Sequence, residues 1–333
     1  MIRYLIGRIV TSFITIIAIS WLAFFIIEIP PGDQIDRFKE ITEARRQVPD
    51  PERMEVLRTY LGLDKPQYVR YLKWMFNMVQ GDLGLSFQYR YQVDEPVKKL
   101  LEDRFWLTVV LAAFTAIVTW TFAIPIGIYS AIRQHSVGDY VFTFIGFSGL
   151  AVPDFLLGLV LMYIAFAYFD QSVGGLNSAD YADAAWNLGR IKDLINHLWI
   201  PAIVLGTSGT AGLIRVMRNN LLDEMSKPYV VTARSKGMRP LSVILKYPVR
   251  VALNPLISTV GYLLPSLVSG SIIVSVVLSL PTMGPLLLEA IVSEDVYLAG
   301  FIIFVAGALT VIGTLISDVL LAVVDPRIKY TRN

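Results

Sequence analysis

Long apolar runs dominate this 333-residue sequence. Six of them approach or exceed the roughly 20 residues that an α-helix needs to cross the core of a bilayer. Hydrophobic residues make up 55% of the chain, and charged residues only 17%. Because lipid offers no hydrogen bonds to the backbone, spanning segments must be helices or a closed barrel, and runs of this length indicate helices. We therefore predict an all-α integral membrane protein.

The apolar runs predict six transmembrane helices. The first exceeds the apolar core of a signal peptide and shows no evident cleavage site, so we expect it to be retained. Pro125 should break the second near its inner end, and Pro153 should kink the third. The small residues of the fourth should let it pack centrally. We place the six at Ile9–Ile29, Thr108–Tyr129, Val141–Phe169, Leu198–Ile214, Leu253–Leu280 and Leu298–Val324.

The polar segments divide the chain into three parts. Residues 1–29 form a short lead and the first span, residues 30–104 a small helical extracytoplasmic region, and residues 105–333 a core of five spans with a cytoplasmic loop at 215–250. The region 30–104 is balanced in charge and carries apolar positions at helical spacing, which predicts helices that pack on themselves or on the span ends. These positions are Val56, Leu57, Tyr60, Leu61, Tyr68, Tyr71, Leu72, Met75 and Phe76.

Basic residues in the short connections give the orientation. The connection 215–250 holds eight Lys and Arg residues against two acids, and the tail after the last span is also basic. Cytoplasmic loops carry such an excess, so this connection and both termini should lie in the cytoplasm.

Within that connection we predict a short helix at the membrane surface. Ser226 can cap it, Pro228 suits its first turn, and Gly237 can end it in a left-handed conformation. Pro240 then suits the start of a second helix. The alternative is an amphipathic loop that only contacts anionic lipid headgroups.

No catalytic constellation is visible in the sequence. There is no cysteine, no phosphate-binding Gly-rich loop with its Lys, and no His-Glu-x-x-His pair. His135 and His197 stand apart, and we expect both to be solvated. Asp154 either caps the helix segment after Pro153 or is functional. Its pairing with Asp318 in an aspartyl protease is disfavoured by their different depths. Six transmembrane helices with no nucleotide-hydrolysing site of their own need a separate source of energy. We therefore predict a cytoplasmic ATPase partner that binds the surface helix.

The sequence resembles a known family, the membrane permease subunits of the dipeptide/oligopeptide/nickel-type ABC importers. Within that family it is similar to the first of the two permease subunits. The segment Pro228-Tyr-Val-Val-Thr-Ala-Arg-Ser-Lys-Gly237 is similar to the family's cytoplasmic "EAA" loop, with Val231-Thr232-Ala233 at the Glu-Ala-Ala positions. The other matching motifs are Pro30-Pro-Gly-Asp33, Leu61-Gly-Leu-Asp-Lys-Pro66, Gly81-Asp-Leu-Gly84 and Val323-Val-Asp-Pro-Arg327.

The resemblance implies the type I ABC importer permease fold in a prokaryotic inner membrane. It implies a second homologous permease subunit, two cytoplasmic ATPase subunits that hold ATP and Mg, and an extracytoplasmic solute-binding protein. This chain would contact membrane lipid and would bind no cofactor, metal or nucleic acid. The implied ATPase-coupling helix comprises Pro228, Tyr229, Val230, Thr232, Ala233, Arg234, Lys236 and Gly237.

We expect Tyr229, Val230 and Ala233 to fill a groove on the ATPase, with Arg234 and Lys236 at its edge. A bulky residue at Gly237 should abolish transport and leave membrane insertion intact. Candidates for the translocation path come from the acid in the third span and the bent fifth span, and are Asp154, Tyr262, Pro265 and Ser269.

The transported solute is not determined by these motifs. A peptide is the first hypothesis, and nickel chelates, opines, oligosaccharides or another small solute are alternatives. Aromatic residues in the outer segments suit either sugar stacking or interfacial belts. These are Trp74, Tyr89, Tyr91, Trp106 and Trp186. An ATP-independent channel or a membrane scaffold is the competing class of function.

Overall fold

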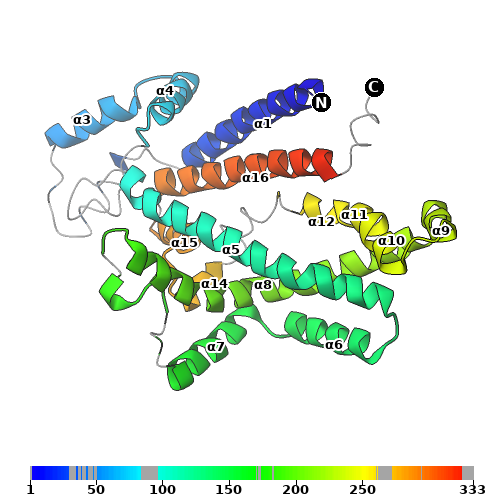
Figure 1. Ribbon diagram of the computed structural model, residues 1–333. Helices are drawn as coiled ribbons and strands as arrows, with labels where there is room; N and C mark the ends of the chain where they lie inside the picture. The colour runs from blue at the N-terminus through cyan, green and yellow to red at the C-terminus, as the bar shows by residue number, and fades with distance from the viewer. Residues whose placement is uncertain are drawn as a thin grey trace. The chain divides into compact units, whose positions relative to one another are not determined.

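The computed structural model describes residues 2–29, 51–83, 97–169, 174–181, 184–259, 272–293 and 295–324, with single residues or pairs at 35–36, 39, 43, 48, 171 and 261. These residues form helices and turns, and no strand occurs among them (Figure 1). The all-α prediction is confirmed for them.

The long helices are α1 (Ile2–Glu28), α5 (Val97–Ile132), α8 (Leu188–Met225) and α16 (Val296–Val324). Shorter ones are α3 (Pro51–Leu61), α4 (Gln67–Val79), α6 (Val137–Ala151), α7 (Asp154–Phe169), η2 (Ala179–Tyr181), α9 (Pro228–Ser235), α10 (Pro240–Lys246), α11 (Pro248–Ala252), α12 (Asn254–Ser258), α14 (Ile272–Val277) and α15 (Met283–Val292). The apolar helix α15 lies between the fifth and sixth predicted spans.

Among the described residues, three helices are long and apolar enough to cross a membrane, at Ile6–Ile26, Arg104–Ile132 and Leu298–Val324. Two bent pairs raise the number to five if each pair is one span. The remaining predicted span, Leu253–Leu280, has its central part outside the described residues, so the count of six stays a prediction.

Proline affects the helices less uniformly than expected. Helix α5 runs through Pro125 and α8 runs through Pro201, so the predicted break in the second span is wrong. Neighbouring helices can satisfy the carbonyl group that a proline leaves without a donor. At Pro153, by contrast, α6 and α7 meet at 102°, which is far more than a kink.

The chain divides into two compact units. One comprises Met1–Ser12, Phe105–Pro285 and Leu309–Asn333, and the other comprises Phe13–Arg104 and Leu286–Ala308. In the second unit the predicted helices of the region 30–104 are confirmed as α3 and α4.

Helix α4 packs through one side only. The Tyr71 hydroxyl lies 2.8 Å from the Ser20 Oγ, the Arg70 guanidinium pairs with Glu28, and the Trp74 ring lies against Phe24 and Phe304. Trp74 therefore packs within its unit. Four members of the predicted apolar set are exposed, so the predicted packing holds for part of the stripe: Val56 of α3 and Tyr68, Leu72 and Phe76 of α4.

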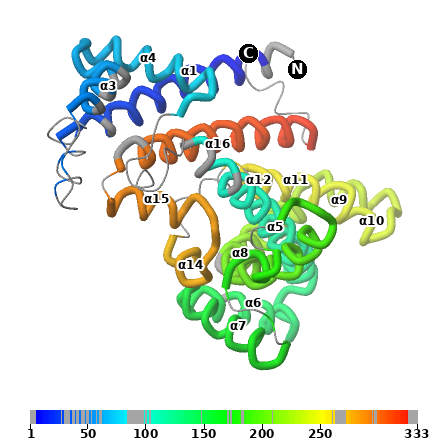
Figure 2. Tube along the Cα trace, turned by 90° about the vertical axis from the view of Figure 1, so that its left-hand side faces the viewer, coloured from blue at the N-terminus to red at the C-terminus, as the bar shows by residue number. Residues whose placement is uncertain are grey.

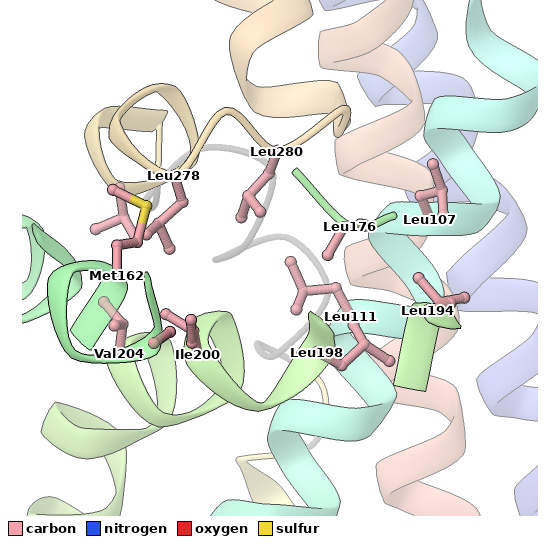
Figure 3. Packing of buried hydrophobic residues seen from close by; sticks show 12 residues of the cluster. Leu107, Leu111, Met162, Leu176, Leu194, Leu198, Ile200, Val204, Leu278 and Leu280 are labelled. Carbon is pink, nitrogen blue, oxygen red and sulfur yellow. The ribbon is translucent and has the colours of Figure 1, made fainter. Parts of the chain in front are cut away.

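The first unit is built around α8. A buried aliphatic cluster joins α5, α7, α8 and the segments near Leu176 and Leu278, as Figure 3 shows. Leu198 and Val204 of α8 face Leu111 and Met162 across it. Helix α8 also packs on α6, α11 and α12, which confirms the prediction that the fourth span is central.

Close contacts between α5 and α8 depend on glycine. A Cβ on Gly127 would lie 2.7 Å from the Met217 Cβ, and one on Gly206 would lie 2.7 Å from the Thr119 Oγ1. Side chains at these positions would force α5 away from α8.

Candidate functional site

The surface helix forms as predicted, with one correction. Helix α9 begins with Pro228 at its first turn, and Gly237 follows it at φ +74°, the left-handed conformation that ends many helices. Lys227, not Ser226, stands at the N-cap, and the Ser226 hydroxyl donates instead to the carbonyl of Asp223 at the end of α8. The fourth helix therefore continues to Met225 and is not complete at Ile214.

The apolar face of α9 is covered by its own chain. Val230 and Ala233 are buried in a small cluster with Val243 of α10. Tyr229 is half-buried beside them, and its hydroxyl donates to the Glu224 carboxylate of α8. Val230 and Ala233 are therefore covered by the chain itself, whereas Tyr229 keeps part of its surface accessible. A groove contact through Tyr229, Val230 and Ala233 stays a prediction.

Helices α9 and α10 also carry apolar side chains that are exposed. Val231 on α9 is 56% exposed, and Leu241 and Leu245 on α10 are 61% and 51% exposed. Other predicted residues of the coupling helix are exposed as well: Pro228, Thr232, Arg234, Lys236 and Gly237. We call Val231, Leu241 and Leu245 the exposed apolar set. Periodicity alone could not show which apolar residues the chain itself covers.

The short helices are joined firmly to the long ones. Ile244 of α10 and Val249 of α11 are buried in a cluster with Met217 and Leu221 of α8. The Arg250 Nε donates to the carbonyl of Val324 at 2.7 Å, which links α11 to the end of α16. Figures 1 and 2 show α9, α10 and α11 following one another at one end of α8. Movement of α9 therefore has packed contacts through which it can reach the spans.

The translocation-path candidates are not brought together in the described part of the chain. Asp154 is the first residue of α7 and is half-buried at the sharp turn after α6. Tyr262, Pro265 and Ser269 lie outside the described residues. Their role stays a prediction.

Other polar residues take structural positions. Asp318 pairs with Arg8 at 2.9 Å, which joins α16 to α1 and gives the acid a partner that we had not foreseen. His197 is only 7% exposed within α8, and its Nδ1 lies 2.8 Å from the carbonyl oxygen of Asp193, so the expectation of a solvated side chain is wrong. His135 is exposed, as expected. Within the described ranges no three His, Asp or Glu residues are grouped to hold a metal ion.

Comparison with known proteins agrees with this arrangement. Residues 123–330 match the family described as "Binding-protein-dependent transport system inner membrane component", and residues 1–112 match the N-terminal domain of such membrane components. The oligopeptide transport system permease protein AppB of Bacillus subtilis is 35% identical over 99% of this chain and its own full length.

Two further relatives cover the whole chain or nearly so. A putative peptide permease protein of Brucella ovis is 33% identical over 99% of this chain, and the dipeptide transport system permease protein DppB of Escherichia coli is 27% identical over all of it. Both matches cover the relative's full length. The chain therefore belongs to the family of inner membrane components of binding-protein-dependent transport systems and is a multi-pass permease subunit of such a system.

Proposed function

We propose that this chain forms half of the translocation pathway of an ATP-driven importer and that a solute-binding protein delivers a peptide to it. A second homologous permease would supply the other half, and two separate ATPase subunits would hydrolyse ATP. The names of the relatives, which transport oligopeptides and dipeptides, support the choice of a peptide.

The observation that carries the proposal is the exposed apolar set on α9 and α10. Binding is favoured when a partner removes exposed apolar side chains from water. Side chains at the centre of an interface contribute most to the binding free energy. Arg234 and Lys236 flank them and suit acidic residues at the rim of an ATPase groove. Because α10 and α11 pack on α8, closure of the ATPases can move the spans as rigid bodies.

The test is a pair of matched substitutions in the complete transporter. Val231→Asp places a charge in the exposed apolar set, whereas Val79→Asp places one at a still more exposed apolar position of α4, which we assign to the opposite side of the membrane. We expect Val231→Asp to reduce the ATPase that co-purifies by at least about tenfold, since a buried unpaired charge costs more than 1.4 kcal/mol. Val79→Asp should leave it unchanged. Equal recovery of ATPase with both variants would contradict the proposed contact.

The solute and the class of function are tested by uptake into proteoliposomes. With ATP inside and the binding protein outside, a labelled tripeptide should accumulate and a labelled trisaccharide should not. Accumulation of the sugar alone would favour the oligosaccharide alternative. Steady electrical conductance without ATP would favour a channel over an importer.

A further inference from the structure

A groove runs between α6 and α8 of the first unit, and it consists of two adjoining cavities. One has a volume of about 460 Å³ and the other about 240 Å³. The two share four lining residues, so they form one continuous path: Phe142, Gly146, Ala211 and Ile214. Figures 1 and 2 both show α6 lying beside α8. Both helices belong to bent apolar pairs long enough to span a membrane, so we expect the groove to lie at membrane depth.

One end of the groove is polar and positively charged. Arg215 and Arg218 of α8 line it together with Asp139 of α6 and His135. Arg218 donates to both carboxylate oxygens of Asp139, at 3.1 and 3.2 Å, and the backbone N–H of His135 donates to the same carboxylate at 3.0 Å. Two guanidinium groups and one carboxylate therefore line this end of the groove, so basic side chains outnumber acidic ones among its lining residues.

The other end of the groove is apolar. Its walls come from Val118 and Phe122 of α5, Ile145 of α6 and Ile203 of α8. Small residues leave the space open where the helices come close, among them Gly146 and Ala211, whose Cβ positions would be 3.5 Å apart if Gly146 carried one. Ile203 is 40% exposed, so this wall faces outward and not into the core.

We propose that the groove binds an anionic phospholipid, with the phosphate at Arg215 and Arg218 and an acyl chain along Phe142, Ile145 and Ile203. Basic pockets between transmembrane helices on the cytoplasmic side suit anionic headgroups, and each buried methylene adds to the affinity. The basic end of α8 leads directly into the connection that the charge pattern assigns to the cytoplasm. A soluble peptide fits less well at the apolar end, because the lining there offers few hydrogen-bonding side chains. The inference does not depend on the transported solute.

The experiment uses the complete transporter in proteoliposomes that contain a trace of phosphatidylglycerol bearing a photoreactive group on one acyl chain. A parallel sample contains phosphatidylcholine with the same group. After illumination, mass spectrometry identifies the labelled peptides. Phosphatidylglycerol should label peptides that contain Phe142–Gly146 and Ile203–Ala211, about fivefold more than phosphatidylcholine does, as expected for one basic residue near the membrane surface.

Matched substitutions separate the two ends of the groove. Arg215→Gln should lower phosphatidylglycerol labelling to the phosphatidylcholine level, and Arg133→Gln, which removes an exposed charge outside the groove, should not. Ile203→Trp should fill the apolar end and reduce labelling by both lipids, whereas Ile195→Trp, at an exposed position of α8 outside the groove, should not.

Two outcomes would overturn the inference. Equal labelling by the two lipids, or labelling that Arg215→Gln does not change, would show that no anionic headgroup is selected. Cross-linking of the groove to the second permease in place of lipid would show that the groove is a subunit interface.

Discussion

The Arg8 guanidinium and the Asp318 carboxylate form an ion pair although they lie 310 positions apart in the sequence. Replacing either residue should therefore change the stability of the contact between α1 and α16. The Asp318 side chain is largely buried and Arg8 is more exposed, so the pair lies between the surface and buried extremes. Arg8→Ala leaves a carboxylate without this partner in an apolar setting. We expect it to lower the stability of the detergent-purified transporter by about 1–3 kcal/mol, measured as a shift in the thermal unfolding midpoint. The charge exchange Arg8→Asp with Asp318→Arg should recover part of the loss, and no recovery would contradict a direct pairing.

Gly237 permits a second test at the residue scale. Its φ of +74° costs any L-residue about 1–2 kcal/mol, and among the described residues no atom lies within 4 Å of a Cβ built there. Gly237→Ala and Gly237→Leu therefore carry a similar backbone cost, but only leucine reaches outward. We expect Gly237→Leu to lose most ATP-driven uptake while Gly237→Ala keeps much of it, with normal amounts of both in the membrane. Equal losses would assign the effect to backbone strain.

At the scale of helices, the contact between α5 and α8 rests on the absence of a side chain. Gly127→Ala would place its Cβ 2.7 Å from the Met217 Cβ and 3.1 Å from the carbonyl oxygen of Ile214, so the helices must separate. We expect a loss of about 1–3 kcal/mol of stability. Gly212→Ala is the control on α8, because its Cβ meets nothing within 4 Å of the described chain and alanine favours helix over glycine. A lower unfolding midpoint for Gly212→Ala than for Gly127→Ala would contradict this packing.

The sequence predicted elements better than contacts. Apolar runs, Pro228, Gly237 and Pro240 identify helices and their ends because these signals are local. Burial of Val230 against Val243 was missed, because a pattern shows which face is apolar and not which part of the chain covers it. Ser226 was misassigned for a local reason: Pro228 occupies the first helical position, so the N-cap is the residue directly before it.

At the scale of the molecule, the arrangement of the spans in the membrane is the main prediction left to test. The chain has no cysteine, so single cysteines introduced at exposed positions report sidedness without interference. With six spans and both ends in the cytoplasm, Lys65→Cys and Asp180→Cys should react with a membrane-impermeant maleimide in whole cells. Arg133→Cys and Arg234→Cys should react only after the membrane is opened. Labelling of Arg234→Cys in intact cells would show that the orientation is the reverse of the predicted one.

The prolines of the connection after α8 have a mechanical consequence. Helices α9, α10 and α11 each begin with proline, at Pro228, Pro240 and Pro248, and each is too short to bend. We expect the three helices to move as rigid segments in series, because the proline ring restricts φ at the start of each helix. Such a linkage has low compliance, so a displacement applied to the first segment is expected to reach the last with little loss. The bond from Arg250 to Val324 would then deliver it to the end of α16 as well as to α8.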